Sequence, residues 1–140
     1  MSETVLRGHP GIGPSVSGIA LVASDNFSAR YDLDLTKGVF SRPGHVLAGQ
    51  SYVDVILVLN AAKGGVATAW MLRDMKQRGL CPKALLLNAA NPIMAQGAAF
   101  AGLALIDRFE VDVTQSITTG DRVDVDPVSG TVTVRSELVP

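Results

Sequence analysis

The sequence predicts a small α/β domain whose sheet mixes parallel and antiparallel strands. Its 140 residues suit one domain that is large enough to bury a real core. Between residues 53 and 106, short apolar runs alternate with stretches of helical periodicity, which predicts parallel strands joined by helices. The segments on either side show partial apolar–polar alternation around turn residues, which predicts antiparallel strands. We therefore expect an α/β domain with a layered or barrel-like β portion.

Composition and charge argue against several classes of function. Twelve basic and thirteen acidic residues leave a net charge of −1 without a block of like charge, unlike a nucleic-acid surface or a polybasic membrane patch. Aromatic residues make up 5% of the chain, too few for a base-stacking platform. The single cysteine, Cys81, cannot form an internal disulfide or hold a metal cluster alone. The sequence shows neither a signal peptide nor a membrane-spanning run, so we expect a soluble, cytoplasmic protein.

The first third of the chain is expected to supply strands and a polar loop. Residues 4–7 are predicted as a short strand and residues 18–23 as a longer one, ended by Ser-Asp-Asn. Residues 30–39 alternate only in part, which suits an edge strand or an extended loop. The Pro-Gly pair at 43–44 breaks that segment.

The central stretch, residues 56–78, is predicted to be a buried strand, a turn and an amphipathic helix. Residues 56–59 are β-branched or Leu and form too short a run for a helix. In the later part, apolar residues recur three and four positions apart with charged residues opposite, and Gly79 ends the helix. Asp74 and Arg78 lie four apart with the acid first, the better order for an ion pair.

The turn before this helix is the best candidate for a binding site. Lys63, Gly64 and Gly65 stand there, and adjacent glycines allow backbone angles that a Cβ would forbid. The N–H groups at a helix start, the positive end of its dipole and a lysine together suit an anion. The spacing is not that of a P-loop. The alternative is a turn that needs glycine for its geometry alone.

The second half of the chain completes the β-α-β pattern and adds a hairpin. Pro92 is expected at the first position of a helix, where its missing N–H costs nothing. The expected elements are a strand at 84–87, a helix from Asn91-Pro92 to about Phe100, a strand at 103–106, a turn at 116–120, and a hairpin of 122–125 with 131–134.

Six segments together resemble one protein family, the small swivelling subunit of aconitase X. They occur in the family's order and spacing, so the resemblance is far more specific than any one motif. It covers roughly residues 15–134, nearly the whole chain. The segments are residues 18–22, 45–51, 63–65, 82–84, 91–98 and 119–126.

The resemblance implies a fold, a partner and a reaction. The fold would be a single swivelling β/β/α domain over residues 1–140, as in the aconitase C-terminal domain. The partner would be a larger catalytic subunit with an iron–sulfur cluster on its own cysteines, so no cofactor is expected on this chain. The reaction would be dehydration of a small hydroxy acid. Family members act on cis-3-hydroxy-L-proline in bacteria and on mevalonate 5-phosphate in archaea, and the alanine-rich, charge-poor composition favours the first.

The resemblance also assigns roles at the turn, with one departure. Dehydration needs a base and a Lewis acid, and the swivelling domain would close over the substrate and exclude water. In the family this turn resembles Gly-Arg/Lys-Gly-Ser-Ser, with a serine placed to act on the substrate. Lys63 and Gly64 match, but Gly65 and Val66 replace the serines. The nearest hydroxyl belongs to Thr68, which becomes the candidate catalytic residue; otherwise a large-subunit residue takes the role, the substrate differs, or the assembly is inactive.

Three further residues are candidates for substrate binding. Asn88 and Asn91 follow a predicted strand, at the edge where open α/β sheets place ligands. The alternative for Asn91 is to cap the next helix. Arg30 lies where many relatives carry an aromatic–glycine stretch; it could reach an anion, or it could be a solvated loop residue.

Other conspicuous residues are expected to be structural. His45 has no second histidine or acid at ligand spacing, which favours packing within a loop. Cys81 lacks basic neighbours in the sequence, which predicts an inert thiol. Trp70 belongs either to the helix core or to the face that meets the large subunit.

The primary hypothesis is therefore the small subunit of a two-subunit hydro-lyase that binds a small hydroxy acid. The alternative is a non-catalytic binding or regulatory module that kept the swivelling fold after losing the serines.

Overall fold

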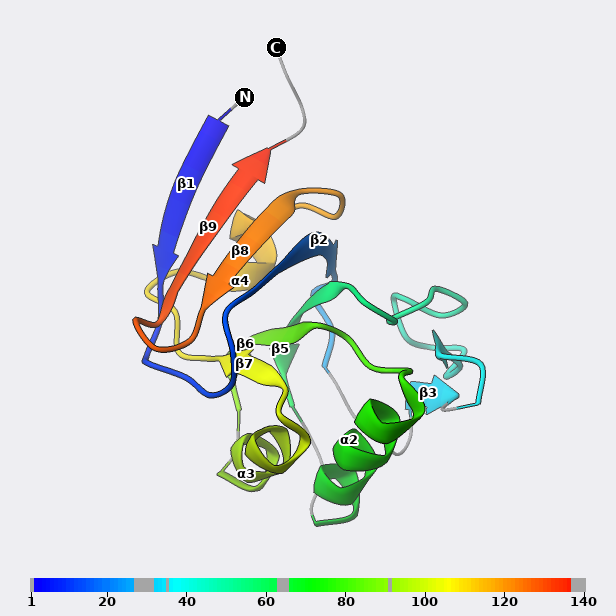
Figure 1. Cartoon of the computed structure of the whole chain (residues 1–140). Helices are drawn as coiled ribbons and strands as arrows, with labels where there is room; N and C mark the ends of the chain where they lie inside the picture. Colours follow the sequence, from blue (N-terminus) through cyan, green and yellow to red (C-terminus); the bar gives the residue numbers. More distant parts are fainter. Residues whose placement is uncertain (1, 27–31, 35, 63–65, 91, 137–140) are drawn as a thin grey trace.

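The chain folds around a seven-stranded mixed sheet with helices on both faces (Figure 1). The computed structural model describes residues 2–26, 32–34, 36–62, 66–90 and 92–136. The strand order is β1-β9-β8-β2-β5-β6-β7, and β3 and β4 form a separate ribbon. The strands are β1 (Ser2–Arg7), β2 (Val16–Val22), β3 (Leu33–Asp34), β4 (Val39–Phe40), β5 (Ile56–Ala61), β6 (Ala84–Ala89), β7 (Ala104–Ile106), β8 (Arg122–Asp126) and β9 (Thr131–Ser136). The helices are α2 (Val66–Arg78), α3 (Pro92–Ala101) and α4 (Val113–Ser116).

Strand β2 joins the two halves of the sheet. Its first part pairs antiparallel with β8, and its last part pairs parallel with β5. Strands β5, β6 and β7 continue the parallel half, whereas β8, β9 and β1 pair antiparallel, with the N-terminal strand β1 at the outer edge beside β9. The predicted parallel centre and antiparallel ends are thus confirmed.

The parallel strands are buried on both faces, which explains why their sequences are almost continuously apolar. In β5, Leu57 and Leu59 point into the core under α2 and α3, while Ile56 and Val58 point into the core shared with α4 and the antiparallel strands. All four are fully buried. Burying one such side chain contributes about 1.5–3 kcal/mol, so the two layers stabilise each other through the same strand.

Helix α2 has the predicted boundaries and surface pairing. Arg78 lies 3.0 Å from Asp74, and Gly79 follows with φ 71°, a conformation that glycine adopts without a steric cost. Trp70 is 63% exposed. The helix-core role considered for Trp70 is therefore wrong, and the alternative, that Trp70 belongs to the face that meets the large subunit, stays a prediction.

Two local features differ from the sequence-based predictions. Helix α4 was not predicted, because four residues are too short to show a periodicity. The described part of the segment predicted at 30–39 is neither one strand nor one extended loop, because β3 and β4 pair as a short antiparallel ribbon in which residue 34 lies opposite residue 39.

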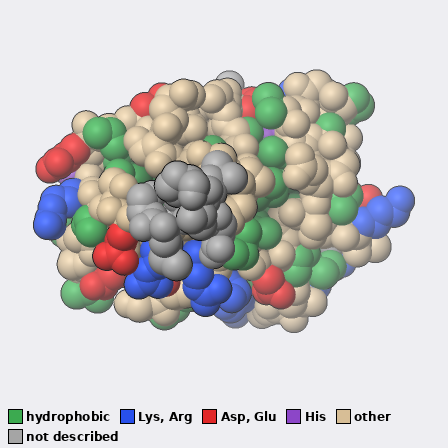
Figure 2. All heavy atoms as spheres, turned by 90° about the horizontal axis from the view of Figure 1, so that it is seen from above, with side chains coloured by type: hydrophobic (Ala, Val, Ile, Leu, Met, Phe, Trp, Pro, Cys, Tyr) green, Lys and Arg blue, Asp and Glu red, His purple; other side chains and the backbone are tan. Residues whose placement is uncertain are grey.

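The surface of the antiparallel half is charged but balanced. Arg135 lies 3.2 Å from Glu3 and 2.8 Å from Asp124 on the neighbouring strands. Figure 2, which looks down on the molecule, shows basic and acidic side chains close to one another on that face.

Across the part of the chain that the structure describes, no helix is long and apolar enough to cross a membrane.

Candidate functional site

The carboxyl ends of the four parallel strands meet at one edge of the sheet. Here this edge is called the carboxyl edge; it comprises residues 24–26 after β2, 60–62 at the end of β5, 88–90 at the end of β6 and 107–112 after β7. Helices α2 and α3 begin directly after it. Ligands of open α/β sheets bind outside the carboxyl ends of the strands, so the edge is the first place to look for a site.

A chain of amide side chains connects three of these strand ends. Asn60 Nδ2 donates to Asn26 Oδ1 at 3.2 Å, and Asn88 Nδ2 donates to Asn60 Oδ1 at 3.1 Å. We call these three residues the amide row. Because each belongs to a different strand end, the row fixes the spacing of segments that are far apart in the sequence.

The row continues to the start of α4. Asn88 Nδ2 also donates to Asp112 Oδ1 at 2.8 Å, while the Val113 N–H donates to Asn88 Oδ1 at 2.9 Å. Asp112 is the N-cap of α4 and accepts from the Thr114 N–H at 3.0 Å. The pKa of Asp112 is lowered, first by the Thr114 hydroxyl and then by Asn88, so the cap is ionised at neutral pH.

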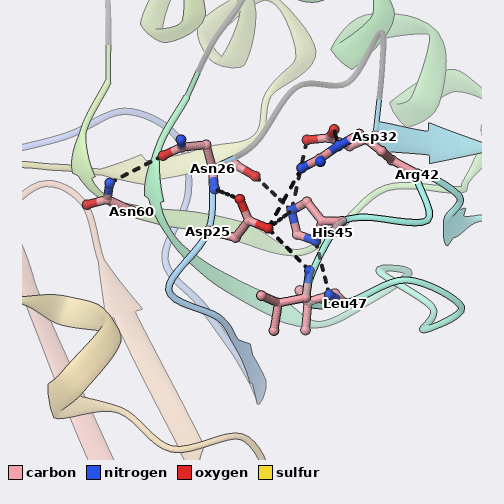
Figure 3. A network of polar contacts seen from close by, with 8 residues as sticks. Asp25, Asn26, Asp32, Arg42, His45, Leu47 and Asn60 are labelled. Atoms are coloured by element: carbon pink, nitrogen blue, oxygen red, sulfur yellow. Dashed lines mark hydrogen bonds and ion pairs between the residues drawn. The ribbon is translucent and has the colours of Figure 1, made fainter.

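A second cluster, which we call the histidine cluster, consists of Asp25, Asp32, Arg42 and His45 (Figure 3). His45 is 3% exposed and stacks on Phe40 with ring centroids 4.6 Å apart. Its Nδ1 accepts from the Leu47 N–H at 3.0 Å, so its Nε2 carries the proton and donates to the Asn26 carbonyl at 2.8 Å. The prediction that His45 packs within a loop is confirmed.

The charges of the histidine cluster are satisfied within the protein. Arg42 Nε donates to Asp32 at 2.5 Å, and the guanidinium lies 3.7 Å from Asp25. The hydrogen bond that Arg42 donates to Asp32 holds the pKa of Arg42 above its ordinary value. Burial tends to raise the pKa of Asp25, but hydrogen bonds from the Asn26 and Val46 N–H groups, with the nearby positive charges, lower it overall. The cluster therefore ties the loop at 42–46 to the carboxyl edge.

The end of β7 contributes an arginine in an unusual backbone conformation. Arg108 has φ 56°, which non-glycine residues rarely adopt. Its N–H donates to the Asn88 carbonyl at 3.1 Å, which joins it to the amide row. Next to it, Asp107 accepts from the Ala90 N–H at 3.1 Å. The Arg108 side chain is 65% exposed, so a solvent-accessible cation lies at this edge.

Of the residues proposed from the sequence, Asn88 is the one whose side chain the structure describes. Both ends of that side chain bind protein groups, as given above. The remaining candidates, Arg30, Lys63, Gly64, Gly65 and Asn91, lie outside the described residues. The backbone of Thr68 belongs to α2, but its side chain is outside the description too. Their roles stay predictions.

Sequence reasoning missed several residues of this edge, although one signal was readable. The tetrapeptide Leu-Asn-Ala-Ala occurs twice, at 59–62 and 87–90. In the sheet these two copies lie side by side, with Leu59 opposite Leu87 and Ala61 opposite Ala89. Asp25, Arg42 and Arg108 gave no comparable signal, because their contacts join residues distant in sequence.

Metal ligands are not grouped in the described part of the chain. No three histidine, cysteine, aspartate or glutamate side chains there could hold a metal ion together. Burial raises the pKa of Cys81, which keeps the thiol protonated at neutral pH, as expected for an inert cysteine.

Comparisons with known proteins agree over almost the full chain. A family model described as the aconitase X swivel domain matches residues 5–134. The phosphomevalonate dehydratase small subunit of Methanocella arvoryzae is 30% identical over 127 residues, which cover 91% of this chain and 96% of that protein. The small subunit of the same name from Methanococcoides burtonii is 33% identical over 115 residues, 82% of this chain and 84% of that protein. The crystal structure of Thermococcus kodakaraensis aconitase X in its holo-form superposes with a TM-score of 0.88 at 26% identity, covering 95% of this chain and 99% of that chain.

Proposed function

Because this chain belongs to the aconitase X swivel-domain family, we propose that it is the small subunit of a two-subunit hydro-lyase acting on mevalonate 5-phosphate or a closely similar phosphorylated hydroxy acid. The relatives described above are named phosphomevalonate dehydratase small subunits, and the chain spans most of their length. This departs from the substrate that composition favoured, since cis-3-hydroxy-L-proline finds no support in these relatives.

The observation that carries the proposal is the convergence of polar groups at the carboxyl edge. The amide row, Asp112 and Arg108 come from four strand ends and one helix start, and they converge where such folds bind ligands. Hydrogen bonds between its own side chains hold the carboxyl edge in one arrangement. This suits one half of a shared binding site, which must keep its shape while the large subunit supplies the other half.

The iron–sulfur cluster is proposed to belong to the large subunit. Cys81 is half-buried with a raised pKa. It lies just before the amino end of β6, and the carboxyl edge lies at the other end of the parallel strands. It does not fit a thiolate ligand at this site. When bound to the large subunit, the cluster would supply the Lewis acid for the departing hydroxyl.

This chain would bind and orient the acid. We propose that Lys63 and the backbone amides of Gly64 and Gly65 hold the substrate carboxylate, and that the Thr68 hydroxyl takes the place of the family serine. Asn88 supports the edge through its neighbours and offers a direct contact only if one of those bonds is exchanged. Arg30 and Asn91 are proposed as additional polar contacts.

The first test is reconstitution with the large subunit. The two chains, produced together, should elute as one complex on size exclusion and dehydrate mevalonate 5-phosphate, with little turnover of cis-3-hydroxy-L-proline. The separate small subunit should be inactive. A stable complex that turns over neither acid would favour a non-catalytic module, and the absence of a complex would contradict the proposal.

The second test addresses the turn itself. In an active complex, Thr68→Ala is expected to lower kcat by about 100-fold if its hydroxyl transfers a proton. Lys63→Ala should lower kcat/KM by about tenfold or more, because it removes a charged contact. Lys76→Ala removes a lysine near the other end of α2 and serves as the matched control. Unchanged kcat and kcat/KM in both site variants would mean that residues of the large subunit, and not this turn, bind the acid and transfer the proton.

A further inference from the structure

We propose that Arg108 binds the phosphate of a substrate that also carries a carboxylate. The inference rests on the proposed function and assigns the second anion of that substrate to a residue of this chain. It is carried by the conformation, the unsatisfied donors and the position of Arg108.

The backbone conformation of Arg108 is unfavourable by itself. With φ 56°, its Cβ is crowded against the backbone, and arginine lacks the short polar side chain with which Asp or Asn relieves this conformation. The other non-glycine residue at positive φ among those described, Asp54, is of that tolerant type. The bond from the Arg108 N–H to the Asn88 carbonyl holds the conformation in place. Conformations of this kind concentrate at functional sites.

The guanidinium of Arg108 makes no hydrogen bond among the described residues. Among the described residues its nearest acidic partner is Asp107, an ion pair with Nε 3.8 Å from Oδ2, which is too long for a hydrogen bond. Asp107 Oδ2 already accepts from the Ala90 N–H. Within the described residues, none of the five N–H donors of Arg108 makes a hydrogen bond, whereas Arg42 in the histidine cluster is held by Asp32 and Asp25.

The chemistry of the free group matches a phosphate. A guanidinium offers two parallel N–H groups that fit two phosphate oxygens, and its charge persists at any physiological pH. The side chain is 65% exposed, so a ligand reaches it without moving the fold. The neighbouring carboxylate of Asp107 already accepts from the Ala90 N–H, and the first turn of α3 adds no further acidic residue.

The position of Arg108 suits a substrate with two separated anions. Arg108 follows β7, and β6 lies between β7 and β5 in the sheet. Two strand spacings place the end of β7 roughly 10 Å from the end of β5. A chain-like hydroxy acid whose carboxylate lies near the end of β5 would thus extend its phosphate along the edge toward Arg108. A small cyclic acid such as hydroxyproline lacks a group to reach it.

The test uses the active two-subunit complex and three variants. Arg108→Ala should raise KM for mevalonate 5-phosphate by about tenfold or more with a smaller change in kcat, and should weaken inhibition by inorganic phosphate to the same degree. Arg108→Lys should recover part of both effects. Arg78→Ala, which removes another exposed arginine, on the far end of α2, is the matched control and should leave both constants unchanged.

A glycine variant separates binding from folding. Arg108→Gly should raise KM as Arg108→Ala does, yet its Tm should be no lower than that of the unaltered protein, because glycine adopts positive φ freely. An active complex in which Arg108→Ala keeps the original KM and phosphate inhibition would overturn this inference and leave the proposed function intact. If the complex forms but does not act on the phosphorylated acid, the proposed function fails first. In that case ¹⁵N spectra of the complex still decide, since added phosphate that fails to shift the Arg108 Nε–H signal would overturn the inference as well.

Discussion

The two ends of the parallel strands carry polar groups of different kinds. At the amino end, a hollow of about 260 Å³ is lined by Ser17, Asp54, Lys76, Cys81 and Lys83 among others. There Lys83 Nζ donates to the Ser17 carbonyl at 3.0 Å, a contact that joins the residue before β6 to the start of β2. At the carboxyl edge, by contrast, side chains bond to side chains across four segments.

The difference shows which end is built to hold a fixed arrangement. The amide row and its continuation to Asp112 link each strand end to the next by hydrogen bonds. Replacing one of these residues should therefore disturb the position of several segments. The amino end has no such chain of bonds among the described residues. Substitutions should therefore have larger and more widely spread effects at the carboxyl edge.

The largest effect is expected for Asn88→Ala. It removes three hydrogen bonds, to Asn60, Asp112 and the Val113 N–H, and should lower the free energy of unfolding by about 2 kcal/mol. Turnover by the complex should fall as well, because the strand ends lose their spacing. Urea denaturation and steady-state assays measure the two effects. Gln77→Ala on the exposed face of α2 is the control, and a loss no greater than that of this control would show that the row does not hold the edge.

A change of opposite sign is expected near the amino end. Tyr52 is fully buried, and its hydroxyl has no hydrogen-bond partner in the described structure. Tyr52→Phe removes this unsatisfied group and should raise the free energy of unfolding by about 1 kcal/mol without altering activity. A destabilised variant would mean that the hydroxyl has a partner after all.

The same residue gives a pH dependence with a defined sign. Burial raises the pKa of Tyr52 from 10.0 to about 12. A group whose pKa is raised on folding stabilises the protein fully below its unfolded value, and this contribution is lost as pH rises through the folded value. The unaltered protein should thus lose stability between about pH 10 and 12 more steeply than Tyr52→Phe. Parallel curves in that window would contradict the burial of the hydroxyl.

A smaller effect is expected for Asp25, and it appears on the acid side. Its pKa is lowered on folding, so its contribution is present above the ordinary value near 3.8 and is lost as pH falls through the folded value. Asp25→Asn should be less stable than the unaltered protein at pH 6, and the gap should close below about pH 4. Thermal unfolding across this range measures it. A gap that persisted at low pH would assign the effect to packing.

The smallest effect is expected for Lys83→Ala. Its side chain is exposed and makes one hydrogen bond to a carbonyl, so stability should change by less than about 0.5 kcal/mol. Activity of the complex should not change. A loss of activity here as large as that of Asn88→Ala would remove the distinction between the two ends.

The fold could be predicted from the sequence much better than the site. Local periodicity marks β5, α2, β6 and α3, because apolar residues repeat within each element. The site depends on contacts between distant residues, such as Asn26 with Asn60 or Arg108 with Asn88, and no local pattern encodes these. The repeated Leu-Asn-Ala-Ala sequence was the exception, since it places two asparagines at equivalent points of adjacent strands.

The central claim is that the substrate is bound at the carboxyl edge. The most direct measurement is a ¹⁵N–¹H correlation spectrum of the labelled small subunit in the complex, recorded with and without mevalonate 5-phosphate. The account predicts that ligand shifts the amide signals of residues 24–26, 60–62, 88–90 and 107–112 and leaves those of 16, 17, 54, 81 and 83 in place. Shifts confined to this second group would contradict it.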